Sequence, residues 1–148
     1  VDIKTDALLT YAVLKAIVIE NYLDIIEHEV NGELIPRPVR LVLTGNRPVD
    51  QILSDTDLRV CCFDGRLADL GKGIPTRLCP VISDNWLTSI PWWSLGLAGV
   101  MGSYVLRNRL RGIVESTKQE GKLLRFWGAP DKVRVEYLRI PFVSVYSY

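Results

Sequence analysis

The chain has 148 residues, of which 48% are hydrophobic and 24% carry a charge, and its formal net charge is +1. This length and composition are those of a globular protein that can bury a core of its own. A net charge this close to zero excludes a general attraction to nucleic acid, so nucleic-acid binding would need a local basic patch.

Residues 6–29 are predicted to form a helix, because apolar side chains recur there at helical spacing. Asn31 and Gly32 supply a left-handed stop, and Pro36 prevents the helix from continuing. The single histidine of the chain, His28, falls in this helix among acidic residues. We therefore expect neither a histidine-dependent catalytic triad nor a metal site with several histidines.

Residues 39–64 are predicted to hold two short buried strands that a polar loop connects. Glycine, proline, serine and aspartate dominate the loop, and these residues favour turns. The expected elements are, in order, a strand over 39–44, a break at Gly45 and Asn46, a turn of helix over 49–53, a strand over 57–63 and a hairpin-type turn over 64–65.

The three cysteines, Cys61, Cys62 and Cys79, show no C-x-x-C spacing. Cys61 and Cys62 are adjacent in a predicted strand, so their side chains point to opposite faces. We expect all three to be small buried hydrophobic residues in a reducing compartment, in preference to a disulfide or a zinc site.

Residues 85–106 carry no charge and include three tryptophans, Trp86, Trp92 and Trp93. Such a stretch is typical either of a membrane-spanning segment or of a buried helix. Pro91 and several hydroxyl side chains favour a loop followed by a buried helix over 90–120. A preceding strand over 77–83 contains Pro80, which favours an edge position.

The rest of the chain is predicted to form strands over 123–127, 132–140 and 142–148. The whole order indicates a single α+β domain over 1–148, with a mixed sheet of about five to six short strands covered by two main helices. The chain begins at Val1, as a processed product or a piece of a longer protein would. No secretion signal opens it, so we expect an intracellular, cytoplasmic protein.

Asp55 and Asp57, two acids at the start of the second predicted strand, are the main candidates for a functional site. Residues two apart in a strand face the same side and lie about 7 Å apart. Carboxylates at this spacing can share Mg²⁺, which in turn can hold phosphate oxygens. The glycine turn at Gly45 and Asn46 would let a phosphate approach the backbone if the two strands are neighbours.

Gly45-Asn46 followed by Ser54-Asp55-Thr56-Asp57-Leu58 resembles the signature of the polymerase-beta-type nucleotidyltransferase superfamily. The resemblance implies magnesium-dependent nucleotidyl transfer or nucleotide binding. It also implies that Asp55, Asp57 and a third carboxylate, Glu136, act as metal ligands and catalytic residues. Gly45, Asn46 and Ser54 would contact the nucleoside triphosphate.

The chain departs from this family at two positions. Asn46 replaces the usual serine, and Glu136 stands where the family has an aspartate, so an inactive relative is a second possibility. A simpler interpretation of residues 54–57 is a polar turn that feeds a strand, with serine and aspartate making local backbone hydrogen bonds.

The alternative function is that of a non-catalytic structural or interaction subunit of a larger, virus-like or membrane-associated assembly. It predicts an apolar patch around Trp92 and Trp93 that a protein partner covers. A basic stretch on the second helix, with Arg107, Arg111 and Lys118, could instead hold a nucleic acid, or it could be a solvated helix face. We do not expect membrane insertion.

Overall fold

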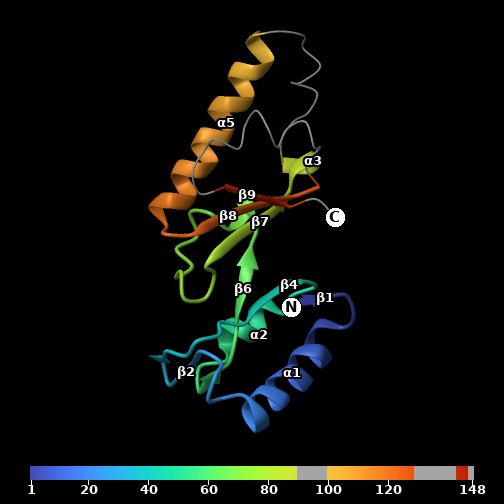
Figure 1. The fold of residues 1–148 in the computed structure, drawn as a ribbon, viewed down its shortest axis with the longest axis vertical. Coiled ribbons are helices and arrows are strands. Elements are labelled where there is room, and N and C mark those ends of the chain that lie inside the picture. The colour runs from blue at the N-terminus through green and yellow to red at the C-terminus, as the bar shows by residue number, and fades with distance from the viewer. Residues whose placement is uncertain (90–99, 129–142, 147–148) are drawn as a thin grey trace. The chain divides into compact units, whose positions relative to one another are not determined.

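A computed structural model describes residues 1–89, 100–128 and 143–146 of the chain (Figure 1). The chain forms two compact units, unit 1 over Val1–Asp64 and unit 2 over Gly65–Tyr148. Each unit has its own strands, helices and buried residues and is described by itself. The expectation of one domain over residues 1–148 stays a prediction.

Unit 1 contains parallel strands that alternate with helices along the chain. β1 (Asp2–Ile3) pairs with β4 (Val42–Gly45), and β4 pairs with β6 (Cys62–Gly65), in parallel in both cases. Helix α1 (Ala7–Asn21) follows β1, and the short helix α2 (Val49–Ser54) follows β4. Parallel neighbours require such crossovers, because the chain must return to the same end of the sheet.

A second, antiparallel sheet in unit 1 has the strand order β3-β2-β5. Its strands are β2 (His28–Val30), β3 (Glu33–Ile35) and β5 (Leu58–Arg59). Asn31 and Gly32 form the hairpin turn with φ of 51° and 85°. Glu29 and Arg59 are paired strand neighbours and form a buried ion pair at 2.9 Å.

This sheet corrects the first predicted helix. α1 ends at Asn21, and His28 lies on β2 instead of in a helix. The apolar residues after Asn21 do not continue the helix. One of them, Ile26, packs with Val18 and Val60 in a buried cluster. The predicted strand over 57–63 is likewise two elements, β5 and β6, which belong to different sheets.

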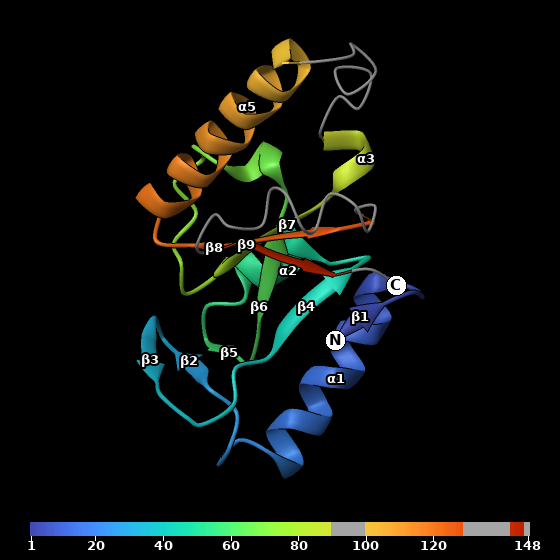
Figure 2. The same ribbon diagram turned by 45° about the horizontal axis from the view of Figure 1, so that its top comes forward.

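Unit 2 contains the parallel strands β7 (Val81–Asn85), β8 (Leu123–Trp127) and β9 (Val143–Tyr146), paired in that order. The described residues of this unit also form a 3-10 turn, η1 (Leu67–Asp69), and the helices α3 (Trp86–Ser89) and α5 (Val100–Gln119). The chain passes from α5 into β8 at Gly121, whose φ is 66° (Figure 2). Leu106, Leu110 and Val114 form the buried stripe of α5.

The predicted α+β class is confirmed, with parallel and antiparallel pairing. The helical turn over 49–53 and the strands over 123–127 and 142–148 correspond to α2, β8 and β9. Residues 64–65 are the end of β6 and not a hairpin turn, because β6 pairs in parallel. The third strand begins at Val81, because residues 75–79 form a turn closed by Pro75.

Other predictions fall partly or wholly outside the described residues. α5 begins at Val100, so the expected helix start near residue 90 is not described, nor is the strand over 132–140. Within the described ranges, no helix has the length and apolar character needed to cross a membrane.

Candidate functional site

The parallel strands of unit 1 have one apolar face. Its residues are Ile3, Leu43 and Phe63, none of them more than 2% exposed. Leu43 is the register partner of Phe63, and Ile3 is the partner of Gly45 two residues further along β4. Side chains alternate between faces along a strand, so the residues next to these must point the other way.

The opposite face is polar toward the carboxyl ends of the strands. Asp2 is the register partner of Thr44, and the Thr44 hydroxyl donates a hydrogen bond of 2.6 Å to Oδ2 of Asp64. Asp2, Thr44 and Asp64, one residue from each strand, therefore form a row across the sheet. Parallel sheets are usually covered on both faces by apolar residues, so a polar row at the strand ends is unusual and marks this edge.

A basic residue pairs with each of the two acids of this row. Lys4 follows β1 and forms an ion pair of 2.9 Å with Asp2, and the two side chains are 78% and 50% exposed. Arg47 follows β4, and its Nη1 lies 3.4 Å from Oδ1 of Asp64. Both side chains of this second pair are nearly buried, at 13% and 4% exposed. The edge thus combines an exposed cation with a sheltered ion pair.

We call this group of residues the carboxyl edge of unit 1. Its members are Asp2, Lys4, Thr44, Asn46, Arg47 and Asp64. Helix α1 also begins here, directly after the loop that carries Lys4, with Asp6 as its N-cap; the Asp6 side chain accepts a 2.7 Å hydrogen bond from the Leu9 amide. In parallel α/β sheets, ligands bind outside the carboxyl ends of the strands.

Gly45 and Asn46, two of the predicted phosphate contacts, lie at this edge. Both stabilise the local backbone structure. A Cβ atom at Gly45 would lie 2.4 Å from the Ile3 carbonyl oxygen, so the glycine lets β1 approach β4. Its φ of +76° also favours glycine. The Asn46 side chain donates a 2.9 Å hydrogen bond to the Thr5 carbonyl and fixes the loop after β1.

Asp55 lies elsewhere and is engaged by α1. Lys15 Nζ lies 2.6 Å from both of its carboxylate oxygens, and the Tyr11 hydroxyl donates a 2.7 Å hydrogen bond to Oδ2. Lys15 is eight residues beyond Ala7, about 12 Å along the helix from the carboxyl edge. The structure therefore does not bring Asp55 together with Gly45.

The connection between β4 and β6 explains this separation. The chain leaves the carboxyl end of β4 at Gly45, passes through α2 and residues 54–57, and enters β6 at its amino end. Because β4 and β6 are parallel, the glycine turn and the two acids belong to opposite ends of the strand pair. A sequence motif does not reveal which end of a strand its loop occupies.

The remaining predicted site residues are dispersed. Ser54 donates a 3.0 Å hydrogen bond to the Gln51 carbonyl, as in a local turn. Asp57 is exposed, and its backbone carbonyl accepts a hydrogen bond from the Asn31 amide. Glu136 lies outside the described residues. Among the described residues, no group of three or more histidines, cysteines or acids is placed to hold a metal ion.

A buried polar cluster surrounds Asp55 at the contact with α1. Burial, and then the hydrogen bond to Asp55, raise the pKa of the Tyr11 phenol above its ordinary value. Burial likewise raises the pKa of the Cys61 thiol, to about 12. All three cysteines are free and are buried, and their burial was predicted. Raised pKa values suppress the reactive anions, so this cluster is suited to holding α1 and not to nucleophilic chemistry.

The predicted basic patch lies on α5 of unit 2. Arg107, Arg111 and Lys118 are all exposed, and their spacing places them on one side of the helix. Glu115, also exposed, lies on the same side and offsets part of this charge. Nucleic-acid binding stays a prediction. Trp92 and Trp93, the predicted partner site, lie outside the described residues.

Sequence reasoning missed Asp2, Lys4, Thr44, Arg47 and Asp64. A signal was present for two of them, because each ends an apolar run that forms a parallel strand: Thr44 follows 41–43 and Asp64 follows 60–63. Asp2, Lys4 and Arg47 follow no such run.

Comparison of the chain with models of known protein families, with curated proteins and with solved structures finds no match to any of them.

Proposed function

We propose that the carboxyl edge of unit 1 binds a phosphorylated small molecule such as a nucleoside triphosphate, with Lys4 as the main phosphate contact. The observation that carries this proposal is the polar row of Asp2, Thr44 and Asp64 on a sheet whose other face is apolar. Lys4 extends from this row into solvent, where a ligand can reach it.

Lys4 is the exposed cation of the edge, and it is the group through which an anion can bind. The ammonium group of Lys4 can exchange its partner Asp2 for a phosphate, which offers more oxygen acceptors. The amino end of α1, a helix of 15 residues, begins three residues later, but the Asp6 carboxylate already caps its Leu9 amide, so Lys4 stays the main phosphate contact. Asp64 is already occupied by Thr44 and Arg47, so it positions the edge and does not repel the ligand directly.

Binding and transfer are separate parts of this proposal. Nucleotidyl transfer would need metal-bound carboxylates near the phosphates. Asp55, the first carboxylate of the predicted metal site, forms an ion pair with Lys15. The proposal therefore rests on ligand binding at the carboxyl edge, and the magnesium site of Asp55, Asp57 and Glu136 stays a prediction.

Calorimetric titration of the whole chain with ATP and Mg²⁺, and with inorganic phosphate alone, tests the proposal. We expect Lys4→Ala to weaken binding about tenfold, as the loss of one charge-assisted hydrogen bond does. Lys72→Ala is the matched control, because Lys72 is also an exposed lysine paired with a nearby aspartate, Asp69. Absence of binding, or equal affinity in Lys4→Ala, would overturn the proposal.

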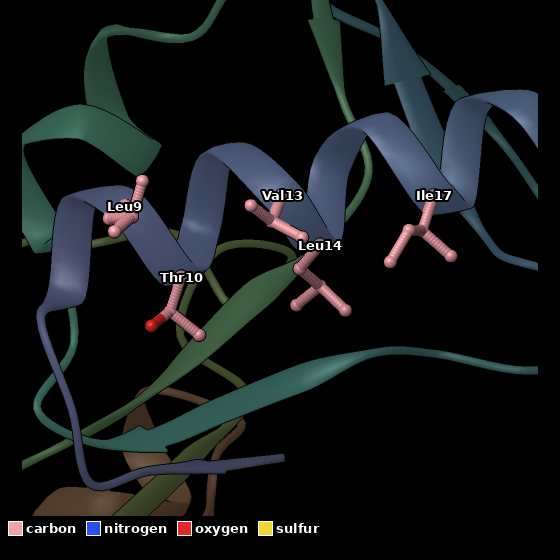
Figure 3. A pocket seen from close by; sticks show the side chains of 5 residues that line it. All are labelled: Leu9, Thr10, Val13, Leu14 and Ile17. Carbon is pink, nitrogen blue, oxygen red and sulfur yellow. The ribbon is translucent and has the colours of Figure 1, made fainter.

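A second candidate is a protein-interaction role, favoured by the outer surface of α1. Leu9, Val13 and Ile17 are 67%, 52% and 45% exposed. Together with Thr10 and Leu14 they line a shallow hollow of about 390 Å³ (Figure 3). A helix with apolar residues all round is typical of one that is covered on both sides.

Sedimentation velocity over a range of concentrations tests this candidate in the form of self-association. We expect the mass of the sedimenting species to rise with concentration in the native chain and not in Val13→Glu. Lys15 lies on the same helix but is engaged by Asp55, so Glu20→Gln, an exposed change on α1, serves as the control. A monomer at every concentration would exclude self-association through α1.

A further inference from the structure

Helix α5 of unit 2 has one face in the core and the opposite face in solvent. Leu106, Leu110 and Val114 are at most 6% exposed. Thr117 continues this stripe at 1% exposed, and its hydroxyl donates a 2.7 Å hydrogen bond to the Ile113 carbonyl within the helix. Because these residues recur every three or four positions, they fix the rotation of α5 about its own axis, and the residues on its opposite side face solvent.

The outer face of α5 concentrates the positive charge of the chain. Between Val100 and Gln119 the helix carries four basic residues and one acidic residue, all of them exposed, which gives a formal charge of +3. The net charge of the whole chain is only +1, so all other residues together sum to −2. A chain with almost no net charge therefore still has a local basic patch, which is what binding of a polyanion requires.

The basic patch is a line along one side of the helix. Arg107 and Arg111 are one turn apart, which is about 6 Å along the axis, and both are exposed. Lys118 extends the line by two turns but has a further interaction in the structure, so the two arginines are the main phosphate contacts. Arg109 projects to a different side, where its Nε donates a 3.1 Å hydrogen bond to the Ser89 carbonyl.

An aromatic residue continues this line toward the amino end of α5. Tyr104 comes one turn before Arg107 and is 64% exposed. Trp86 and Phe126 of the same unit are 2% and 0% exposed and pack edge-on against each other, so they are core residues and Tyr104 is not. Where an exposed ring lies beside arginines, a base can stack on the ring while its phosphates contact the guanidinium groups.

We propose that the basic patch of α5, together with Tyr104, binds single-stranded nucleic acid through its phosphates and one stacked base. Charge complementarity selects a polyanion, and the planar guanidinium groups of Arg107 and Arg111 suit phosphate oxygens. The exposed ring of Tyr104 selects a polyanion that carries bases. An anionic membrane fits less well, because the apolar stripe of α5 is buried in unit 2 and cannot enter lipid. The inference uses residues of unit 2 alone and goes beyond the proposed function of unit 1.

Fluorescence anisotropy tests the inference, with the whole chain and labelled oligodeoxythymidine and oligouridine of about 16 nucleotides. We expect the logarithm of the affinity to fall linearly with the logarithm of the salt concentration. Arg107→Ala and Arg111→Ala should each weaken binding about tenfold. Each should also reduce the slope by about 0.7, the contribution of one phosphate contact on a single strand. Tighter binding of one oligonucleotide would support the inference and assign DNA or RNA as the ligand.

Two further variants test the ring and the sign of the charge. Tyr104→Ala should weaken binding about tenfold and leave the affinity for an abasic oligonucleotide of the same length unchanged. Tyr104→Phe should bind nearly as well as the native chain, because the ring remains. Glu115→Gln should strengthen binding, because Glu115 is an exposed acid one turn beyond Arg111.

Matched controls in unit 1 change the net charge by the same amounts. Arg37→Ala and Glu20→Gln alter exposed residues and should leave the affinity unchanged. Absence of binding at every salt concentration, or equal weakening by Arg37→Ala and Arg107→Ala, would overturn the inference. An unchanged affinity in Tyr104→Ala would overturn the choice of nucleic acid over other polyanions. Binding to vesicles of phosphatidylserine and phosphatidylcholine, but to neither oligonucleotide, would assign the patch to a membrane surface instead.

Discussion

The hydroxyl group of Thr44 lies 2.6 Å from Oδ2 of Asp64 and joins two parallel strands of unit 1 through their side chains. Asp64 is 3% exposed, and Arg47 approaches its other carboxylate oxygen at 3.4 Å. A carboxylate this well sheltered needs both contacts, because a buried charge without compensation is costly. The polar row at the carboxyl edge is therefore part of the fold as well as a candidate site.

Replacing the buried carboxylate should destabilise unit 1. Asp64→Asn keeps the shape of the side chain but removes the charge that pairs with Arg47. We expect a loss of about 2–4 kcal/mol in the free energy of unfolding, measured by urea denaturation. Asp57→Asn, at an exposed position, should change it by less than about 0.5 kcal/mol. Equal effects of the two substitutions would contradict the role assigned to Asp64.

Two glycines with similar backbone angles should respond differently to alanine. Gly45 and Gly71 have φ of +76° and +81°, but only Gly45 has backbone atoms where a Cβ would lie. Gly71→Ala should cost about 1–2 kcal/mol, which is the strain of the left-handed conformation. Gly45→Ala should cost clearly more, because β1 must move away from β4. Thermal unfolding measures both, and a cost for Gly45→Ala no larger than that of Gly71→Ala would argue against the close approach.

The contacts of Asp55 should contribute to stability and not to ligand binding. Tyr11→Phe removes the hydrogen bond to Asp55 and should cost about 1 kcal/mol. Tyr22→Phe is the control, because Tyr22 is 48% exposed. Urea denaturation gives the stability, and titration with ATP gives the affinity. A change in affinity for Tyr11→Phe without a change in stability would instead return Asp55 to the ligand site.

The stability of the fold should fall in alkaline solution, partly through Cys61. Burial raises the pKa of this thiol from 9.0 to about 12, so the folded chain keeps its proton where the unfolded chain loses it. The stabilising contribution is complete below pH 9 and is lost as the pH rises toward 12. The raised pKa of Tyr11 acts in the same direction.

Urea denaturation at pH 8 and pH 10.5 measures this dependence. We expect Cys61→Ala to show a smaller decrease between the two pH values than the native chain, because the titrating thiol is absent. Cys79→Ala controls for the loss of a buried thiol elsewhere in the chain. An unchanged slope in Cys61→Ala would show that Cys61 does not contribute.

Local patterns predicted much of the fold but not its pairing. The start of α1, the turn of α2 and the strands β8 and β9 follow from apolar spacing and turn residues. The end of α1 does not, because the apolar residues after Asn21 continue a helical pattern that pairing of β2 with β5 overrides. Tertiary contacts of this kind regularly outweigh local preference.

The candidate site was harder to predict than the fold. Residues 54–57 match a known motif, and their chemistry suits a metal ion, but a motif carries no information about register. Lys4 and Asp64 are 60 positions apart in the sequence, and only the parallel pairing of β1, β4 and β6 brings their strands together. The residue types alone would have suggested two unrelated surface charges.

The burial of all three native thiols gives an experimental advantage. A cysteine introduced at an exposed position would be the group that a maleimide reagent modifies first in the folded chain. Glu33 in unit 1 and Lys72 in unit 2 are exposed and suit such replacement. A pair of spin labels or fluorophores at these positions would report the separation of the two units in solution, on a native background that needs no prior removal of cysteine.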